Sequence, residues 1–301
     1  MGIESFGGRP DRNAELRIDN EKRVDSMEKT AEKLLTRYPA IRDYMEKVAI
    51  HPETLTDYNP STVKIDMDDA AKMREKMNES DLELQYGKLN GKEVKQLSEI
   101  LEYQIYTGIN KYDWIPFCKA IKTSDFDDII NGVDMVVEYN NEQSFGHLGL
   151  GVDVSFSKNL TKKFKRIKDE IDSYDGKDNR LAEVKYFDSK NSGISGRLYG
   201  MPRVVAALDL GVMEDLAKMS NMQKNHAAKH AIIIEIQHQL KTFREYAEKN
   251  NKACVGQLDR AYKFMTVISQ KLESEQKLEM SEYTKNRQIQ SAVENGLEIF
   301  K

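Results

Sequence analysis

GVDMVVEY at residues 132–139 and HLGLGVDVSF at residues 147–156 are the two stretches of this sequence that decide its fold. Both are rich in β-branched and other apolar residues, which favour β-strands. The polar run NNEQS at residues 140–144 separates them and is typical of a turn. Two strands joined by a polar turn predict a β-hairpin.

The residues that follow the hairpin predict a helix and two further strands. A helix is expected from Asn159 or Thr161 to about Tyr174, because Phe164, Ile167 and Ile171 recur at helical spacing. The last two strands are expected at residues 181–187 (LAEVKYF) and 203–208 (RVVAAL), on either side of a glycine-rich turn. The hairpin, helix and strands predict an α+β fold with a small β-sheet core and a crossover helix.

Helices are expected on both sides of this core. Before it, residues 92–106 give the clearest helical pattern, with Gly108 past the helix end. After it, four helices are expected at about residues 211–222, 224–250, 252–279 and 281–299. The sequence thus predicts an N-terminal helical region at 1–110, an α+β core at 111–210 and a C-terminal helical bundle at 211–301.

Two of the C-terminal helices carry regular apolar faces. The faces consist of Ile232, Ile236, Leu240, Phe243 and Ala247, and of Leu258, Ala261, Met265, Ile268 and Leu272. Such faces indicate either a bundle within the chain or an interface between copies of it. A non-enzymatic interaction or scaffold protein that forms homo-oligomers through these helices is therefore one hypothesis.

Composition excludes several classes of protein. Of the 301 residues, 39% are hydrophobic and 32% are charged, which is typical of a soluble, helix-rich globular chain. The formal net charge of −4 excludes a broadly basic surface, so any nucleic-acid contact needs a local patch. Without a signal-peptide pattern or a long apolar run, we expect a cytoplasmic protein without membrane contact.

Two aspartates stand inside the otherwise apolar hairpin strands, Asp134 in GVDMVV and Asp153 in GVDVSF. Aspartate is disfavoured in strands, and a buried carboxylate without a partner is costly. Binding of Mg²⁺ would explain both residues, because this ion prefers carboxylate oxygens.

The relative position of the two aspartates depends on the register of the hairpin. A tight turn that pairs Tyr139 with Phe145 would put Asp153 on the opposite side of the sheet from Asp134. A longer loop that pairs Tyr139 with Leu148 would put the two aspartates opposite each other. A bulge at the glycines of the second strand could also reset the parity. The sequence allows all of these arrangements.

In this region an acidic helix comes first, followed by a strand with Gly-x-Asp, a strand with Asp-x-Ser, a basic helix and a further strand. This order of elements resembles the core of the PD-(D/E)XK nuclease superfamily. The resemblance covers about 80 to 110 of the 301 residues. It implies an α-β-β-β-α-β unit whose acids hold Mg²⁺ and hydrolyse phosphodiesters. Asp134 would match the first acid, Asp153 the second, and Glu99 or Glu102 the glutamate of the preceding helix.

The chain departs from this family at the motif lysine, where Ser155 stands two positions after Asp153. The lysine role then falls to Lys185 on the next strand, or to Lys162 or Lys165 on the helix. A second mapping takes Asp153 as the first acid and Glu183-Val-Lys185 as the remainder of the motif. A third interpretation is that the chain is an inactive, degenerate member of the family.

The helix after Asp153 is strongly basic and predicts contact with a phosphate backbone. Its cations are Lys158, Lys162, Lys163, Lys165, Arg166 and Lys168. A solvated helix face balanced by neighbouring acids is the alternative. We therefore expect a Mg²⁺-dependent nuclease or its inactive remnant, with Asp134 and Asp153 as metal ligands, Lys185 and Glu102 as further catalytic residues, and the basic helix as the nucleic-acid contact.

Overall fold

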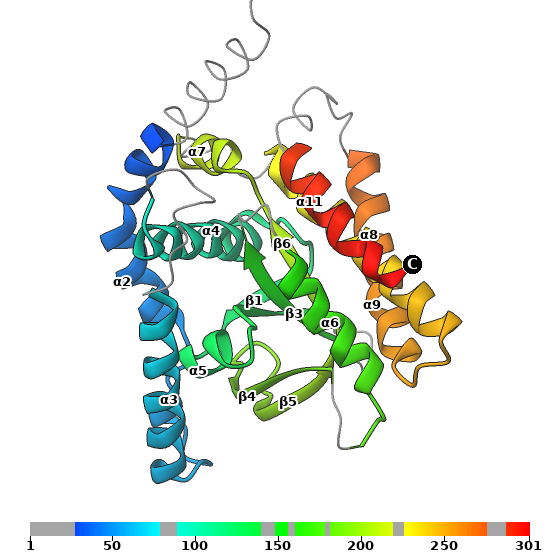
Figure 1. Ribbon diagram of the computed structural model, residues 1–301, viewed down its shortest axis with the longest axis horizontal. Coiled ribbons are helices and arrows are strands. Elements are labelled where there is room, and N and C mark those ends of the chain that lie inside the picture. Colours follow the sequence, from blue (N-terminus) through cyan, green and yellow to red (C-terminus); the bar gives the residue numbers. More distant parts are fainter. Residues whose placement is uncertain are drawn as a thin grey trace, which may run out of the picture.

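The computed structural model describes residues 28–78, 89–139, 148–155, 160–177, 181–218, 226–275 and 287–301. Its centre is a four-stranded sheet in the order β1-β2-β3-β6 (Figure 1). These strands are β1 (Cys118–Lys122), β2 (Met135–Tyr139), β3 (Leu148–Ser155) and β6 (Arg203–Ala207). β2 runs antiparallel to both of its neighbours, β1 and β3, and β6 runs parallel to β3. The expected α+β class is confirmed.

The chain between β3 and β6 contains a helix and a separate hairpin. The crossover helix α6 (Thr161–Ser173) comes first, and β4 (Ala182–Asp188) and β5 (Ser195–Met201) then pair with each other. The predicted apolar face of α6 is confirmed, since Phe164, Ile167 and Ile171 are all buried.

Helices surround this core on both sides in the sequence. The helices before and within the core are α2 (Tyr38–Val48), η1 (Pro52–Thr54), α3 (Pro60–Asn78), α4 (Gly91–Tyr112) and α5 (Asp125–Ile129). Those that follow are α7 (Leu210–Lys218), α8 (Ala227–Lys249), α9 (Val255–Glu275), α11 (Arg287–Leu297) and η4 (Glu298–Phe300). None of the helices in these described ranges combines the length and apolarity that a bilayer span needs.

One face of the sheet packs against α4 and α8. Val137, Val152 and Ala206 of three neighbouring strands meet Ile105 of α4 and Ile233 of α8 around a very small apolar gap. Because β-strand side chains alternate, these inward residues are separated by residues that point to the other face. This packing fixes α4 relative to the ends of β1 and β2.

The β4–β5 hairpin covers part of the opposite face. Val136 belongs to a second buried cluster together with Ala182, Val184, Phe187 and Met201. Gly151 permits this approach, because a Cβ atom there would lie 3.3 Å from the Cβ of Ala182. The glycine in β3 is therefore explained by close packing of the hairpin.

The apolar faces of the C-terminal helices are buried within the chain. All ten residues predicted to form them belong to the main hydrophobic core, which also includes residues of α4 and of the sheet. Among the two alternatives that the spacing allowed, these residues form the intramolecular bundle. The three regions predicted as separate domains contribute to one core.

Several elements differ from the sequence-based expectations. Strand β1 and strand β5 were not predicted, and neither was the short helix α5. Strand β1 reads CKAIK, and its apolar alternation is hidden because Lys122 is buried and faces the core side. Helix α4 continues past Gly108 to Tyr112, since the glycine lies against the Trp114 indole instead of ending the helix.

Candidate metal centre

Helix α4 places Glu102 at the end of the sheet. The helix begins with a capping box, in which the Glu93 amide donates to Asn90 Oδ1 (3.0 Å) and the Asn90 amide donates to Glu93 Oε2 (2.9 Å). Leu101 and Ile105 are buried on the core side and fix the rotation of the helix. Glu102 follows directly and is itself only 4% exposed.

The short helix α5 supplies Asp128. Ser124 caps this helix and accepts a hydrogen bond from the Asp127 amide (3.2 Å). The Asp127 carboxylate in turn accepts from the backbone amides of Lys185 (2.6 Å) and Tyr186 (3.0 Å). These bonds tie α5 to strand β4, so Asp128 projects from a fixed backbone.

The hairpin register brings Asp134 and Asp153 together. Tyr139 pairs with Leu148 and Met135 with Val152, so the longer of the two loops is the correct one. One step further along this register, Asp134 lies opposite Asp153. Here the regular ladder ends: the Asp134 amide donates to Val152 O (2.9 Å), and Asp134 Oδ2 accepts from the Val154 amide (2.5 Å).

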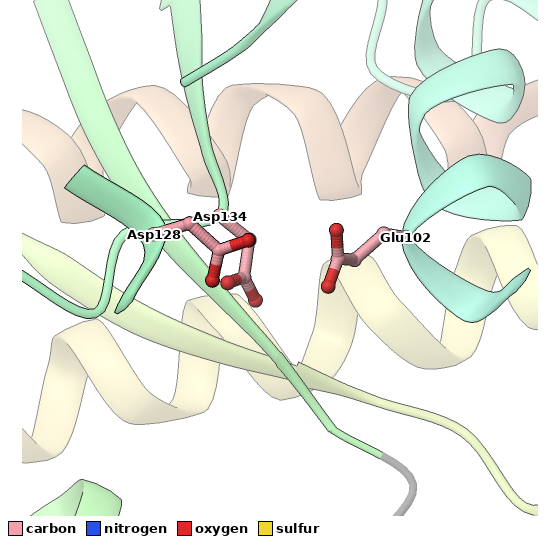
Figure 2. Close-up of side chains that lie close together, drawn as sticks. All are labelled: Glu102, Asp128 and Asp134. Atoms are coloured by element: carbon pink, nitrogen blue, oxygen red, sulfur yellow. The ribbon is translucent and has the colours of Figure 1, made fainter. Parts of the chain in front are cut away.

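Three carboxylates converge at this point, as Figure 2 shows. One oxygen from each of Glu102, Asp128 and Asp134 lies within 4.8 Å of the other two. We call these three residues the acidic cluster. They come from α4, from α5 and from the residue before β2, so no short sequence motif contains them.

Two lysines flank the acidic cluster. Lys122 donates to Glu102 Oε2 (2.9 Å) and to Asp128 Oδ2 (3.0 Å), and only 8% of its side chain is exposed. On the other side, Lys163 of α6 forms an ion pair with Asp153 and donates to Val154 O (3.0 Å). The Lys163 side chain remains 30% exposed, so it can still meet a bound molecule.

Burial and the crowding of negative charge raise the pKa of Asp134 well above its usual value. Burial is the largest cause, and the charges of Glu102, Asp128 and Asp153 add to it. Burial likewise raises the pKa of Glu102. Asp128 behaves differently, because Lys122 and Lys95 outweigh the effect of burial and lower its pKa. A further cation would relieve the repulsion at Asp134.

The structure brings some of the predicted site residues together and leaves others elsewhere. Asp134 and Glu102 belong to the acidic cluster, and Asp153 lies beside the cluster, where it forms an ion pair with Lys163. Glu99, the other helix candidate, accepts a hydrogen bond from the Tyr38 hydroxyl (2.6 Å). Lys185 forms its ion pair with Asp66 of α3, not with either hairpin aspartate.

The predicted nucleic-acid contacts lie on several sides of α6. Lys162 is exposed, Lys165 pairs with Asp169 at 2.7 Å, and Arg166 donates to Ile130 O (3.1 Å). Lys163 points the other way, to Asp153. Lys158 lies outside the described residues.

Sequence reasoning missed Asp128 and Lys122. Asp128 stands in the run TSDFDD at residues 123–128, where a serine followed by acids is a helix-start signal. That signal would have revealed α5, but not that its last acid meets Asp134. Lys122 gave no signal, because an alternating strand was not evident around it.

The donor set of the acidic cluster fits a hard divalent cation. Mg²⁺ prefers oxygen ligands and is held in proteins by one or two carboxylates, with water filling the remaining positions. The cluster already holds a cationic group, the Lys122 ammonium, between two of its carboxylates. The arrangement therefore provides both the ligand atoms and the negative potential that such an ion requires.

Comparison with known proteins found no family model, no curated protein and no solved structure that matches the chain.

Proposed function

We propose that this protein is a Mg²⁺-dependent phosphodiesterase that acts on nucleic acid. The observation that carries the proposal is the acidic cluster, in which carboxylates from α4, α5 and the start of β2 converge within 4.8 Å. Glu102 stands 26 positions before Asp128, and three carboxylates that are costly to bury are brought together at the end of a sheet. A bound cation accounts for this arrangement.

Each residue has a distinct role in the proposed reaction. Glu102, Asp128 and Asp134 would hold the ion, which would supply Lewis acidity for attack of water on a phosphodiester. Asp153 orients Lys163 through their ion pair. The partly exposed Lys163 ammonium then positions the attacking water or a phosphate oxygen beside the cluster.

The order of elements supports the family resemblance proposed from the sequence. Helix α4 is followed by three successive antiparallel strands, a crossover helix and a strand parallel to the third. This is the α-β-β-β-α-β order that the resemblance implies, with α5 and the β4–β5 hairpin as additions. Lys163, from the helix after β3, would take the role of the motif lysine that is absent two positions after Asp153, where Ser155 stands.

Cleavage assays with Asp134→Asn and Asp153→Asn test the proposal. Asparagine preserves the shape of each side chain, and at position 134 it can still accept the Val154 amide bond. We expect wild-type protein to cleave single- or double-stranded oligonucleotides in Mg²⁺ and not in EDTA. Each variant should lose roughly a hundredfold or more in rate.

Asp188→Asn is the matched control, because Asp188 is an exposed strand aspartate distant in sequence from the cluster. It should cleave like the wild type. Isothermal titration with Mg²⁺ distinguishes an inactive remnant: binding that Asp134→Asn abolishes supports the metal centre even without cleavage. Absence of both cleavage and Mg²⁺ binding in the wild type would contradict the proposed function.

A further inference from the structure

A cleft of about 480 Å³ opens beside the acidic cluster. Glu102, Lys122 and Asp128 line one end of it and so belong to both the cluster and the cleft. Its remaining walls come from α2, the segment after it, η1, α3, the first half of α4 and the start of α5. A ligand in the cleft would therefore reach the place where the proposed reaction occurs.

Away from the acidic cluster, the lining of the cleft has equal numbers of basic and acidic residues, the acids being Glu46, Glu53, Glu99 and Asp125. Four basic residues line that part: Arg42, Arg74, Lys92 and Lys95. Arg74 is paired with Asp125 (2.7 Å) and Lys95 approaches Glu99 (4.0 Å). Arg42 and Lys92 form no ion pair with any residue that the structure describes. These two positive charges are available to an anion.

Arg74 also has an unused hydrogen-bond donor. Its Nε atom is buried and has no hydrogen-bond partner among the described residues, although its Nη2 atom contacts Asp125. A buried donor without an acceptor costs free energy, and a ligand oxygen would remove that cost. Arg42 and Arg74 line the same cleft, and both oppose the rise in the pKa of Tyr38 that burial causes.

The walls of the cleft also include apolar side chains. Met45, Ile50, Pro52 and Met67 lie among the cations. A cleft that mixes apolar surface with a few charged groups, at a volume of several hundred Å³, is typical of a small-molecule site. A long duplex would instead require an open groove that follows its backbone.

We propose that this cleft binds one nucleotide, either free or at the end of a strand, with its phosphate held by Arg42, Arg74 and Lys92. The identity of the ligand as a nucleotide rests on the proposed function. The apolar wall would contact the base or sugar, while the bond to be cleaved lies at the end formed by Glu102 and Asp128.

Binding of 5′-AMP to the full chain in EDTA tests the inference, because no cleavage occurs without metal. Calorimetric titration should show 5′-AMP binding, and the Arg42→Ala/Lys92→Ala double variant should bind it at least roughly tenfold more weakly. Adenosine lacks the phosphate, and its weaker binding should not change in this variant. Both substituted residues are exposed, so the fold should be retained.

Lys47→Ala/Lys64→Ala is the matched control, since it removes two exposed cations from α2 and α3 that do not line the cleft. It should bind 5′-AMP like the wild type. Equal weakening by both double variants would reduce the effect to general electrostatics and overturn the inference. So would failure of the wild type to bind either 5′-AMP or a 5′- or 3′-phosphorylated single-stranded oligonucleotide.

The two ligand sources are separated by comparing these probes. Tighter binding of a phosphorylated oligonucleotide than of 5′-AMP assigns the cleft to a strand end, and binding of 5′-AMP alone assigns it to a free nucleotide. The inference and the proposed function fail separately. Asp134→Asn should keep 5′-AMP binding in EDTA, whereas metal-dependent cleavage that survives without any nucleotide binding would overturn only the inference.

Discussion

At the scale of single residues, the lysine proposed to act beside the acidic cluster is the main difference between the sequence-based expectation and the structure. Lys185 alternates with Glu183 on β4, and the sequence favoured it because the lysine of the family motif is missing beside Asp153. In the fold, its ammonium contacts Asp66 and lies over the Phe126 ring. Lys163 contacts Asp153 instead, and burial does not keep its pKa low, because Asp153 and Asp134 raise it.

Lys163→Ala should therefore reduce the rate of Mg²⁺-dependent cleavage by roughly a hundredfold, the range of a positioned proton-transfer or orienting group. Lys185→Ala should retain most of the rate, because it removes an ion pair with Asp66 and contacts with aromatic rings, and none with the acidic cluster. Initial rates on the same oligonucleotide, with thermal melting to confirm folding, measure both. A larger loss in Lys185→Ala than in Lys163→Ala would reverse the assignment.

At the scale of elements, α4 links the site to the core. Its buried face packs on the sheet, and its last turns carry Gly108, which faces Trp114. A Cβ atom at Gly108 would lie 2.5 Å from Cδ2 of the indole, closer than packed atoms approach. The glycine thus determines how near the chain after α4 can return, and with it where β1 begins.

Gly108→Ala should lower the free energy of unfolding by about 1–3 kcal/mol, the usual effect of overpacking, even though alanine favours helices. Gly256→Ala in α9 is the contrasting variant. Its nearest neighbour would be Arg260 Nη1 at 3.8 Å, so stability there should be unchanged or slightly increased. Urea denaturation followed by circular dichroism measures both. Unchanged stability in Gly108→Ala would show that the Trp114 contact is not tight.

At the scale of the whole molecule, one hydrophobic core runs through the sheet, α4, α6 and the C-terminal helices. Both cysteines belong to it: Cys118 of β1 is 3% exposed and Cys254, just before α9, is 0% exposed. They are free thiols that stand 136 positions apart in the sequence. Their accessibility therefore reports whether the core opens as one unit.

Both thiols should react very slowly with Ellman's reagent at pH 8 and become reactive together during urea unfolding. The thiolate is the reactive form, and burial disfavours this charge, raising the pKa of Cys254 to about 11 and that of Cys118 as well. Native-state labelling of Cys254 should thus accelerate as the pH rises toward 11, whereas the unfolded thiol titrates near its ordinary value. Labelling of one cysteine well before the other would indicate that the core unfolds in parts.

The sequence by itself determined the features that depend on local periodicity. The strands around Asp134 and Asp153, the apolar faces of α4 and α6, and the bundle faces of α8 and α9 could all be read from residue spacing, because alternation and helical repeats are written into short segments. Asp134 and Asp153 were identified as candidate site residues in the same way, since a carboxylate is unusual among the β-branched residues of a strand.

Only the tertiary structure decided which of these residues meet. The hairpin register depended on loop length, and the choice between Tyr139–Phe145 and Tyr139–Leu148 pairing determined whether Asp134 and Asp153 lie together. Lys122 joins the site because β1 packs on α4, Asp128 because α5 packs against α3 and β4, and Lys163 because α6 crosses beside β3. Convergence of this kind is set by packing between distant segments, and no spacing within one segment encodes it.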